Sequence, residues 1–157
     1  MPPATHAFAF SGQLLQRGFW LYVWEIRPRD GTTIHYVGRT GDSSSQNAQS
    51  PFNRMGQHLG FNDKSNVLRK RLQKRGIAPE ACEFRLVAHG PILAETESLE
   101  EHRRARDVVA ALEKALAEAM CAAGYEVINT VACRKPLDDA QFTLVREGFA
   151  RHFSKLA

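Results

Sequence analysis

The sequence predicts an α/β domain in which helices flank a small, mainly antiparallel β-sheet. An aromatic and β-branched run near the start is followed by a turn and then by a second apolar run, the pattern of a hairpin. Later in the chain, apolar residues recur at helical spacing over long stretches. No repeat, linker or low-complexity tract divides the 157 residues, which is a length that one domain with its own core can have.

The first two strands are expected to pair as an antiparallel hairpin. Residues 19–26 (FWLYVWEI) are rich in aromatic and β-branched side chains, and residues 34–38 (IHYVG) form a shorter run of the same kind. Between them, RPRDGTT contains a proline and an Asp-Gly pair, which favour a turn. Residues 1–17 are expected to be a loosely ordered N-terminal segment, and residues 18–157 to form the single domain.

Two helices are predicted after the polar loop RTGDSSSQNAQSP, which is long enough in a compact domain to indicate a functional role. Pro51 suits the first turn of a helix that Ser50 would cap. A second helix is predicted over residues 62–75, with apolar residues on one side, and Gly76 would end it.

The second half of the chain predicts two strands and two helices. Residues 82–88 (CEFRLVA) alternate as a half-buried strand does, and residues 126–129 (EVIN) are expected to form a short extended segment. A long helix with an acidic start is predicted over residues 99–123, and a closing helix over residues 138–153. The predicted order is therefore β-β-α-α-β-α-β-α.

The composition is that of an ordinary globular protein, with 43% hydrophobic and 24% charged residues. No apolar run approaches the roughly 18 residues that a membrane span needs, so no membrane partner is expected. The start of the chain lacks the basic and apolar stretches of a signal peptide, which makes the cytoplasm the expected location. Cys82, Cys121 and Cys133 have no CxxC spacing, and this favours reduced thiols over a zinc site or a disulfide framework.

Positive charge is concentrated in one segment. The net charge is +4, a mild indication of a polyanionic partner. Six cations lie between residues 64 and 75, and only Asp63 is nearby to offset them: Lys64, Arg69, Lys70, Arg71, Lys74 and Arg75. A solvated helix face and a phosphate-binding surface both explain such a run, and both interpretations stay open.

Polar residues at four places are candidates for a site. Tyr22 and Tyr36 stand on the two strands of the hairpin. Strand tyrosines usually pack in a core, but the second tyrosine begins the glycine-containing sequence YVGRTGD. Arg54 and His58 are four residues apart, so they lie on one helix face, where they could grip a phosphate or form a plain surface pair. Glu113 lies between leucines near an apolar seam, where a carboxylate is costly unless it is paired or holds a metal.

The fourth place is Asn129, at the end of the short extended segment, where a capping or turn role is the alternative to a functional one. Together, the four places resemble the GIY-YIG nuclease family. The matching segments, in the family's order, are WLY at 20–22 for Gly-Ile-Tyr, YVGRT at 36–40 for Tyr-Ile-Gly-x-Thr/Ser, RMGQH at 54–58 for Arg-x-x-x-His/Tyr, LEKAL at 112–116 for Leu-Glu-x-x-Leu, and VINT at 127–130 for the closing (Leu/Tyr)-Asn-Thr. The resemblance covers most of the chain and implies a small stand-alone member of the family.

The chain departs from the family pattern in several respects. Trp20 replaces the first glycine, and an extra basic helix follows His58. The interval between Glu113 and Asn129 is long, which leaves Glu118 as a competitor for the metal. Glu113 is preferred because leucines flank it as the motif requires.

The resemblance implies a GIY-YIG endonuclease that hydrolyses phosphodiester bonds in DNA with one Mg²⁺ or Mn²⁺ ion. In that family a single Glu, here Glu113, holds the metal, and waters complete the shell, which suits Mg²⁺. Arg54 would donate to the scissile phosphate. The residues expected to act in catalysis are Tyr22, Tyr36, Arg54, His58 and Glu113. The residues expected to bind the substrate are Arg39, Thr40, Lys70, Arg71, Lys74 and Asn129.

The proton acceptor stays open between Tyr22 and Tyr36, with His58 able to share the task. A tyrosine pKa of about 10 makes a poor base at neutral pH, so a cation, either Arg39 or the metal, must lower it. Two alternatives to a DNA nuclease also remain: a catalytically silent nucleic-acid-binding domain on the same scaffold, and an RNA nuclease. With one catalytic centre per chain, cutting both strands would need a dimer or two nicks.

Overall fold

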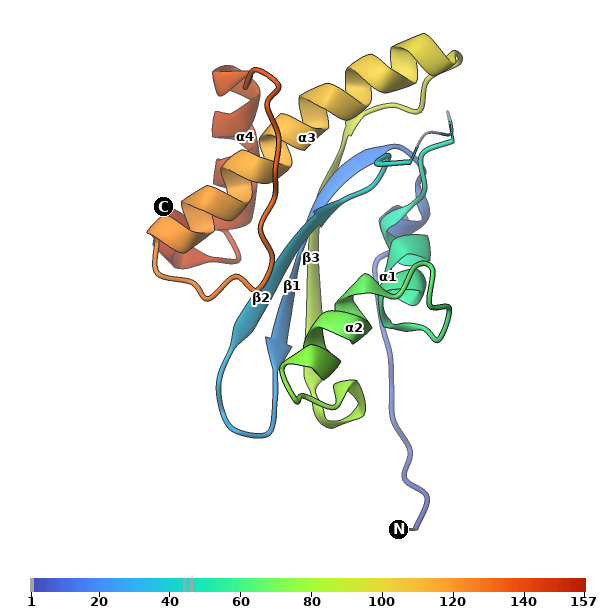
Figure 1. The fold of residues 1–157 in the computed structure, drawn as a ribbon, viewed down its shortest axis with the longest axis vertical. Coiled ribbons are helices and arrows are strands. Elements are labelled where there is room, and N and C mark those ends of the chain that lie inside the picture. Colours follow the sequence, from blue (N-terminus) through green and yellow to red (C-terminus); the bar gives the residue numbers. More distant parts are fainter. Residues whose placement is uncertain (1, 44, 46) are drawn as a thin grey trace.

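A three-stranded antiparallel sheet with helices on both faces forms the protein (Figure 1). The computed structural model describes residues 2–43, 45 and 47–157. The strands are β1 (Phe19–Arg27), β2 (Ile34–Arg39) and β3 (Glu83–Leu93), arranged in the order β2-β1-β3. The α/β architecture expected from the sequence, a small antiparallel sheet flanked by helices, is confirmed.

The helices divide between the two faces of the sheet. Their bounds are α1 (Pro51–Leu59), α2 (Val67–Lys74), α3 (Leu99–Ala122) and α4 (Asp139–Ala150). Short 3₁₀ helices span Gly12–Leu15, Pro79–Ala81 and Ser154–Leu156. In Figure 1, α1 and α2 lie on one side of the sheet, whereas α3 and α4 lie together on the other. Within the described part of the chain, no helix has both the length and the apolar character needed to cross a membrane.

The central strand β1 is buried on both faces because neighbours cover each side. Leu21 and Val23 pack with α3 and α4, while Tyr22 and Trp24 pack with α1 and α2. Side chains alternate along a strand, so β1 contributes every second residue to each of two separate hydrophobic clusters. The sheet thus has an α3–α4 face and an α1–α2 face with different neighbours.

The start of α1 predicted from its capping residue is confirmed. Ser50 caps α1 by accepting a hydrogen bond at Oγ from the Asn53 amide at 3.2 Å, and Pro51 occupies the first turn. Asp138 caps α4 in the same way, accepting from the Gln141 amide at 3.0 Å. These bonds satisfy amides that have no partner within their own helices.

The helix predicted over residues 62–75 begins later than expected, so that part of the prediction is wrong. Residues 62–66 form turns because Asn62 supplies local acceptors: its Oδ1 accepts from the Lys64 amide, and its carbonyl accepts from the Ser65 and Asn66 amides, each at 3.0 Å. Asparagine side chains compete with helical hydrogen bonds in this manner. The helix α2 starts only at Val67.

The third strand is longer than predicted. It continues beyond Ala88 through Gly90 and Pro91, and Leu93 pairs with Phe19 after an irregularity in register. Glycine and proline weaken a strand in general, but here β1 offers a partner on the other side of the irregular stretch.

The prediction of a short strand over residues 126–129 is wrong. This segment makes one isolated parallel bridge to β2, in which Val127 lies opposite His35. Two backbone hydrogen bonds of 2.8 Å flank it, from the His35 amide to the Glu126 carbonyl and from the Ile128 amide to the His35 carbonyl. Beyond this point the Asn129 side chain, rather than its backbone, contacts β2.

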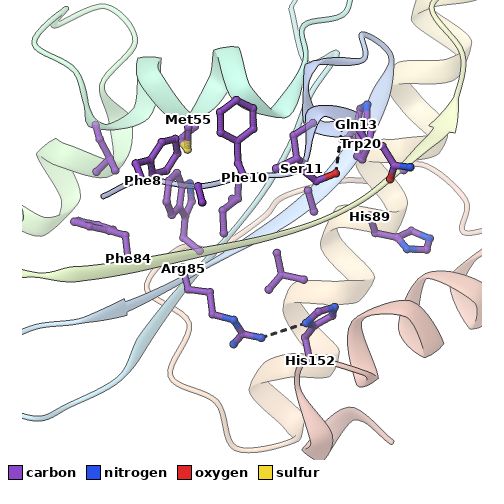
Figure 2. A pocket seen from close by; sticks show the side chains of 18 of the residues that line it. Phe8, Phe10, Ser11, Gln13, Trp20, Met55, Phe84, Arg85, His89 and His152 are labelled. Atoms are coloured by element: carbon purple, nitrogen blue, oxygen red, sulfur yellow. Dashed lines mark hydrogen bonds between the residues drawn. The ribbon is translucent and has the colours of Figure 1, made fainter. Parts of the chain in front are cut away.

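The residues before β1 run between α1 and β3 (Figure 2). Phe10 extends toward α1, where its ring stacks on Phe52 with centroids 4.9 Å apart. Arg17 anchors the end of the segment through hydrogen bonds to the Ala48 carbonyl at 3.2 Å and to Glu95 at 2.6 Å.

Candidate active site

Tyr22 and His58 form a buried hydrogen-bonded pair between β1 and α1. The phenolic oxygen of Tyr22 lies 2.5 Å from Nε2 of His58, and the two rings meet edge to face with centroids 5.6 Å apart. Each residue is only 2% exposed. The structure therefore brings together two of the residues predicted for catalysis.

Gly38 explains how the Tyr22 ring reaches this position. The two residues are opposite one another in the β1–β2 pairing, and a side chain on Gly38 would place its Cβ 2.5 Å from the Tyr22 ring. Real Cβ atoms do not approach a neighbour so closely, so only glycine leaves the space that the ring fills. The glycine of the sequence YVG is thus a packing partner of the first tyrosine.

Tyr36 lies on the same face of the sheet, next to the pair. Its ring centroid is 5.3 Å from that of His58, again in an edge-to-face arrangement. The guanidinium of Arg71 lies 6.0 Å from the centre of the Tyr36 ring, which brings a cation of α2 toward the cluster. The two tyrosines and His58 come from β1, β2 and α1, and they meet because both strands present alternate residues to α1.

Arg54 stands one helical turn before His58 and is partly exposed. One of its terminal nitrogens donates to Asp42 at 3.1 Å, and the other donates to Gln57 at 3.2 Å. Its Nε is buried without a partner. The two terminal nitrogens therefore fix the orientation of the guanidinium, and not all of its N–H donors are used.

Asp42 and Gln57 were not predicted from the sequence. Asp42 lies in the polar loop directly after the YVGRT sequence, so its position in that loop was the available signal. Gln57 differs from any other helical glutamine only through its contact with Arg54, which the sequence does not reveal.

Glu113 lies on α3 and forms an ion pair with Arg39 of the edge strand β2. The Nε of Arg39 donates to Oε2 of Glu113 at 2.7 Å, and both side chains are largely buried. The other oxygen, Oε1, accepts no hydrogen bond from the described residues. A buried carboxylate requires a partner, and here Arg39 provides it. The sequence had instead predicted that Arg39 binds the substrate.

Glu118, the competing candidate for the metal, occupies a different environment. Its side chain is 69% exposed and lies 3.8 Å from Lys114. Five residues correspond to about 140° of rotation around a helix, which turns Glu118 away from the direction of Glu113.

Thr40 and Asn129 are engaged within the fold. The Thr40 hydroxyl is fully buried, accepts from the Trp20 amide at 2.9 Å and donates to the Gly18 carbonyl at 2.6 Å. The Asn129 side chain accepts from the Val37 amide at 3.0 Å and donates to the Val37 carbonyl at 2.7 Å. In this structure both residues hold backbone segments in place.

The basic residues predicted to bind phosphate lie on and beside α2 with different degrees of engagement. Lys70 donates to the Asp63 carbonyl, and Arg69 contacts the Leu59 carbonyl at 2.8 Å. Arg71 and Lys74 are exposed.

The pKa values of the central groups are displaced by burial. Burial raises the pKa of Tyr22 far above its ordinary value, although the positive charge of Arg54 opposes the effect. The pKa of Tyr36 is raised in the same way. Burial and the charge of Arg54 lower the pKa of His58 to about 3. At neutral pH both tyrosines and His58 are consequently uncharged.

Burial also raises the pKa of Glu113, and Arg39 only partly opposes this effect. Asp42 contributes to the same direction, because its negative charge disfavours a second one nearby. A cation near Glu113 would stabilise its carboxylate and so oppose both effects on the pKa. Among residues 2–43, 45 and 47–157, no three His, Cys, Asp or Glu side chains gather into a metal cage.

A cavity of ≈ 920 Å³ lies apart from these residues, between the N-terminal segment, α1 and β3 (Figure 2). Its lining includes Phe8, Phe10, Trp20 and Met55 and none of the predicted catalytic residues. The candidate site consists of the hydrogen-bonded polar groups described above, since the cavity lining is mainly apolar and its polar members, such as Arg85, His89 and His152, lie apart from them. No family model, curated protein or solved structure matches the chain.

Proposed function

We propose that the protein is a metal-dependent endonuclease that hydrolyses phosphodiester bonds in DNA through a GIY-YIG-type site. The observation that supports this most strongly is the gathering of Tyr22, Tyr36, Arg54 and His58 on the α1–α2 face of the sheet. Their spacing in the sequence matched the family motif, and their positions in space fit a shared task. A buried tyrosine–histidine pair beside an arginine with an unpartnered nitrogen is more polar than packing requires.

Arg54 is suited to hold the scissile phosphate. Its guanidinium is partly exposed, and Asp42 and Gln57 fix its orientation. A planar guanidinium can donate two parallel hydrogen bonds to phosphoryl oxygens, and its charge would stabilise the negative charge that grows in the transition state.

The Tyr22–His58 pair is suited to accept a proton from the attacking water. As the Tyr22 oxygen takes the water proton, it can pass its own proton to Nε2 of His58, which becomes an imidazolium. A bound phosphate would assist, because a nearby negative charge raises the pKa of His58 from its low value in the free protein. Tyr36 lies beside His58 and could accept the proton in the same way.

Glu113 fits the role of the metal ligand. Arg39 donates only to Oε2, so Oε1 remains available to a metal ion. Burial raises the pKa of the Glu113 carboxyl, and a bound cation would lower it again. When bound, Mg²⁺ would lower the pKa of a bound water and neutralise charge on the phosphate. Arg39 would then keep the carboxylate oriented toward β2.

The deciding experiment is a cleavage assay with supercoiled plasmid, linear duplex, single-stranded DNA, branched DNA and RNA, each with and without Mg²⁺ or Mn²⁺. We expect metal-dependent cleavage of DNA that is lost in Glu113→Gln and kept in Glu118→Gln, since Glu118 is exposed and paired with Lys114. Metal should raise the melting temperature of the wild type through linkage, but not that of Glu113→Gln. Activity that survives Glu113→Gln and disappears in Glu118→Gln would contradict the proposed metal site.

A catalytically silent nucleic-acid-binding domain is the second candidate. The ion pair between Arg39 and Glu113 favours it, because this pair already satisfies part of the carboxylate without a metal. Binding of DNA without cleavage of any substrate, with either metal present, would support this candidate against the nuclease.

A further inference from the structure

The outer surface of α1 carries a shallow groove of ≈ 380 Å³. This volume lies within the roughly 300–1,000 Å³ range of small-ligand sites. Gly56 leaves the groove open, because a Cβ at this position would meet nothing within 4 Å. The polar side chains that line the groove are Asn53, Gln57, Asn62 and Ser65.

Two exposed phenyl rings line the groove. Phe52 is 38% exposed and Phe61 is 83% exposed, although each belongs to a residue type that usually avoids water. Phe52 is also one member of a series of rings: Phe10 stacks on it, and Phe8 lies 5.5 Å from Phe10 between ring centres. A cluster of exposed apolar rings is a feature of surfaces that bind partners.

Positive charge lies next to these rings. The guanidinium of Arg69, which forms an ion pair with Glu80 at 2.7 Å, stands 4.3 Å from the centre of the Phe61 ring. Gln57, which lines the groove, accepts a hydrogen bond from Arg54, the residue proposed to hold the scissile phosphate. The groove therefore joins aromatic faces and amide groups to a basic border, which is complementary to bases attached to a phosphate backbone.

We propose that this groove binds the unpaired bases of single-stranded DNA next to the scissile phosphate. The proposal rests on the proposed nuclease function and narrows its substrate to DNA with an unpaired segment. Phenyl rings stack on base faces, which a duplex hides, and the amides of Asn53 and Gln57 can pair with base edges. An apolar peptide would offer no hydrogen-bonding group to the amides of Asn53 and Gln57.

The test measures binding of a labelled oligonucleotide by fluorescence anisotropy in EDTA, so that no cleavage is needed. We expect Phe52→Ala and Phe61→Ala each to weaken binding of single-stranded DNA at least about fivefold, while binding of a blunt duplex changes less than about twofold. Phe61→Trp should keep the affinity, whereas Phe61→Leu, which is apolar but cannot stack, should lose it. The control is Leu144→Ala, since Leu144 is 64% exposed on α4, across the sheet.

Several results would overturn the inference. These are unchanged binding in both alanine variants, an equal loss for duplex and single strand, full binding by Phe61→Leu, and tighter binding to RNA than to DNA of the same sequence. Circular dichroism melts check that each variant is folded. The binding test can be distinguished from the test of nuclease activity. Binding that depends on Phe52 and Phe61, with no cleavage of any substrate, would support the groove and contradict the enzyme. Cleavage by a protein whose binding does not depend on these rings would support the enzyme and contradict the groove.

Discussion

On the α3–α4 face of the sheet most buried side chains are apolar, among them Leu112, Leu116 and Phe149, although His35 and His102 are also buried there. On the α1–α2 face the corresponding layer contains two tyrosines and a histidine, with an arginine at its border. The first face has the composition of a protein core. The second contains reactive groups at positions where leucine or valine would pack with less difficulty.

Buried polar atoms without a partner among the described residues occur on both faces. Four of them belong to the α1–α2 side: Nε of Arg54, Nδ1 of His58, Nε1 of Trp24 and Oδ1 of Asn66. Three belong to the α3–α4 side: Nε2 of His35, Nδ1 of His102 and Oε1 of Gln141. Each such group costs about 1–3 kcal/mol when no water reaches it. Two of the four lie on α1 within one turn, so the local cost is concentrated where we place the chemistry.

The largest effect is expected on the apolar face. Phe149→Ala should lower the free energy of unfolding by about 3–5 kcal/mol, because the ring is fully buried and its removal leaves a cavity. Urea denaturation measures the change. Leu144→Ala on the same helix should stay within about 0.5 kcal/mol, since that side chain is exposed. Equal losses in the two variants would mean that α4 does not pack as described.

On the polar face, Arg54→Lys should affect turnover rather than folding. Lysine keeps the charge but cannot reproduce the planar fork, so we expect DNA binding to persist while the cleavage rate falls about 100-fold. Single-turnover kinetics separate the two quantities. Arg103→Lys, an exposed arginine on α3, is the matched control and should cut normally. Unchanged turnover in Arg54→Lys would remove Arg54 from the site.

The stability of the polar face should depend on pH through His58. Its pKa of about 3 in the folded protein lies below its ordinary value of 6.5, so below pH 6.5 the unfolded chain binds a proton that the native protein does not. Stability contributed by this group is therefore lost as the pH falls, by about 2 kcal/mol between pH 7 and pH 5. In His58→Gln the free energy of unfolding should fall by about 2 kcal/mol less between these two pH values than in the wild type.

Urea denaturation of both proteins at the two pH values provides the comparison. Burial also lowers the pKa values of His35 and His89, but they remain in the variant and cancel in the difference. Identical pH dependence in the two proteins would show that His58 is not buried in a neutral form.

The smallest effect concerns the basic helix at the border of the polar face. Replacing Arg71 and Lys74 by Ala should weaken DNA binding equally for all sequences and reduce the slope of log affinity against log salt by about 0.9 for each lost phosphate contact. Lys70→Ala should change the slope less, because its amine already donates to the Asp63 carbonyl. An unaltered slope in the double variant would support a solvated helix face.

Elements with local signals were predictable from the sequence. The hairpin followed from its aromatic runs, and α1 followed from Ser50 and Pro51. The errors arose where a distant or side-chain partner decides the outcome. Asn62 replaced a helical turn by its own hydrogen bonds, and β3 extended past Gly90 because β1 offered a partner.

The same distinction applies to the candidate site. The gathering of Tyr22, Tyr36 and His58 could be anticipated, since strand alternation and helical spacing place such residues on common faces. The pair between Arg39 and Glu113 could not, because 74 positions separate the two residues in the chain. Asp42 belongs to a loop whose conformation no periodicity describes.

The free edge of β2 shows a further consequence of the contact between Asn129 and Val37. A strand edge with unpaired amides and carbonyls is a template on which another chain can add a strand, the first step toward aggregation. Here the amide side chain of Asn129 imitates a neighbouring strand, since it both accepts from and donates to the same residue. It continues the cover that the bridge at Val127 begins. The bridge at Val127 and the Asn129 side chain together occupy backbone groups of the edge strand that carries Tyr36, which leaves fewer of them for pairing with a second molecule.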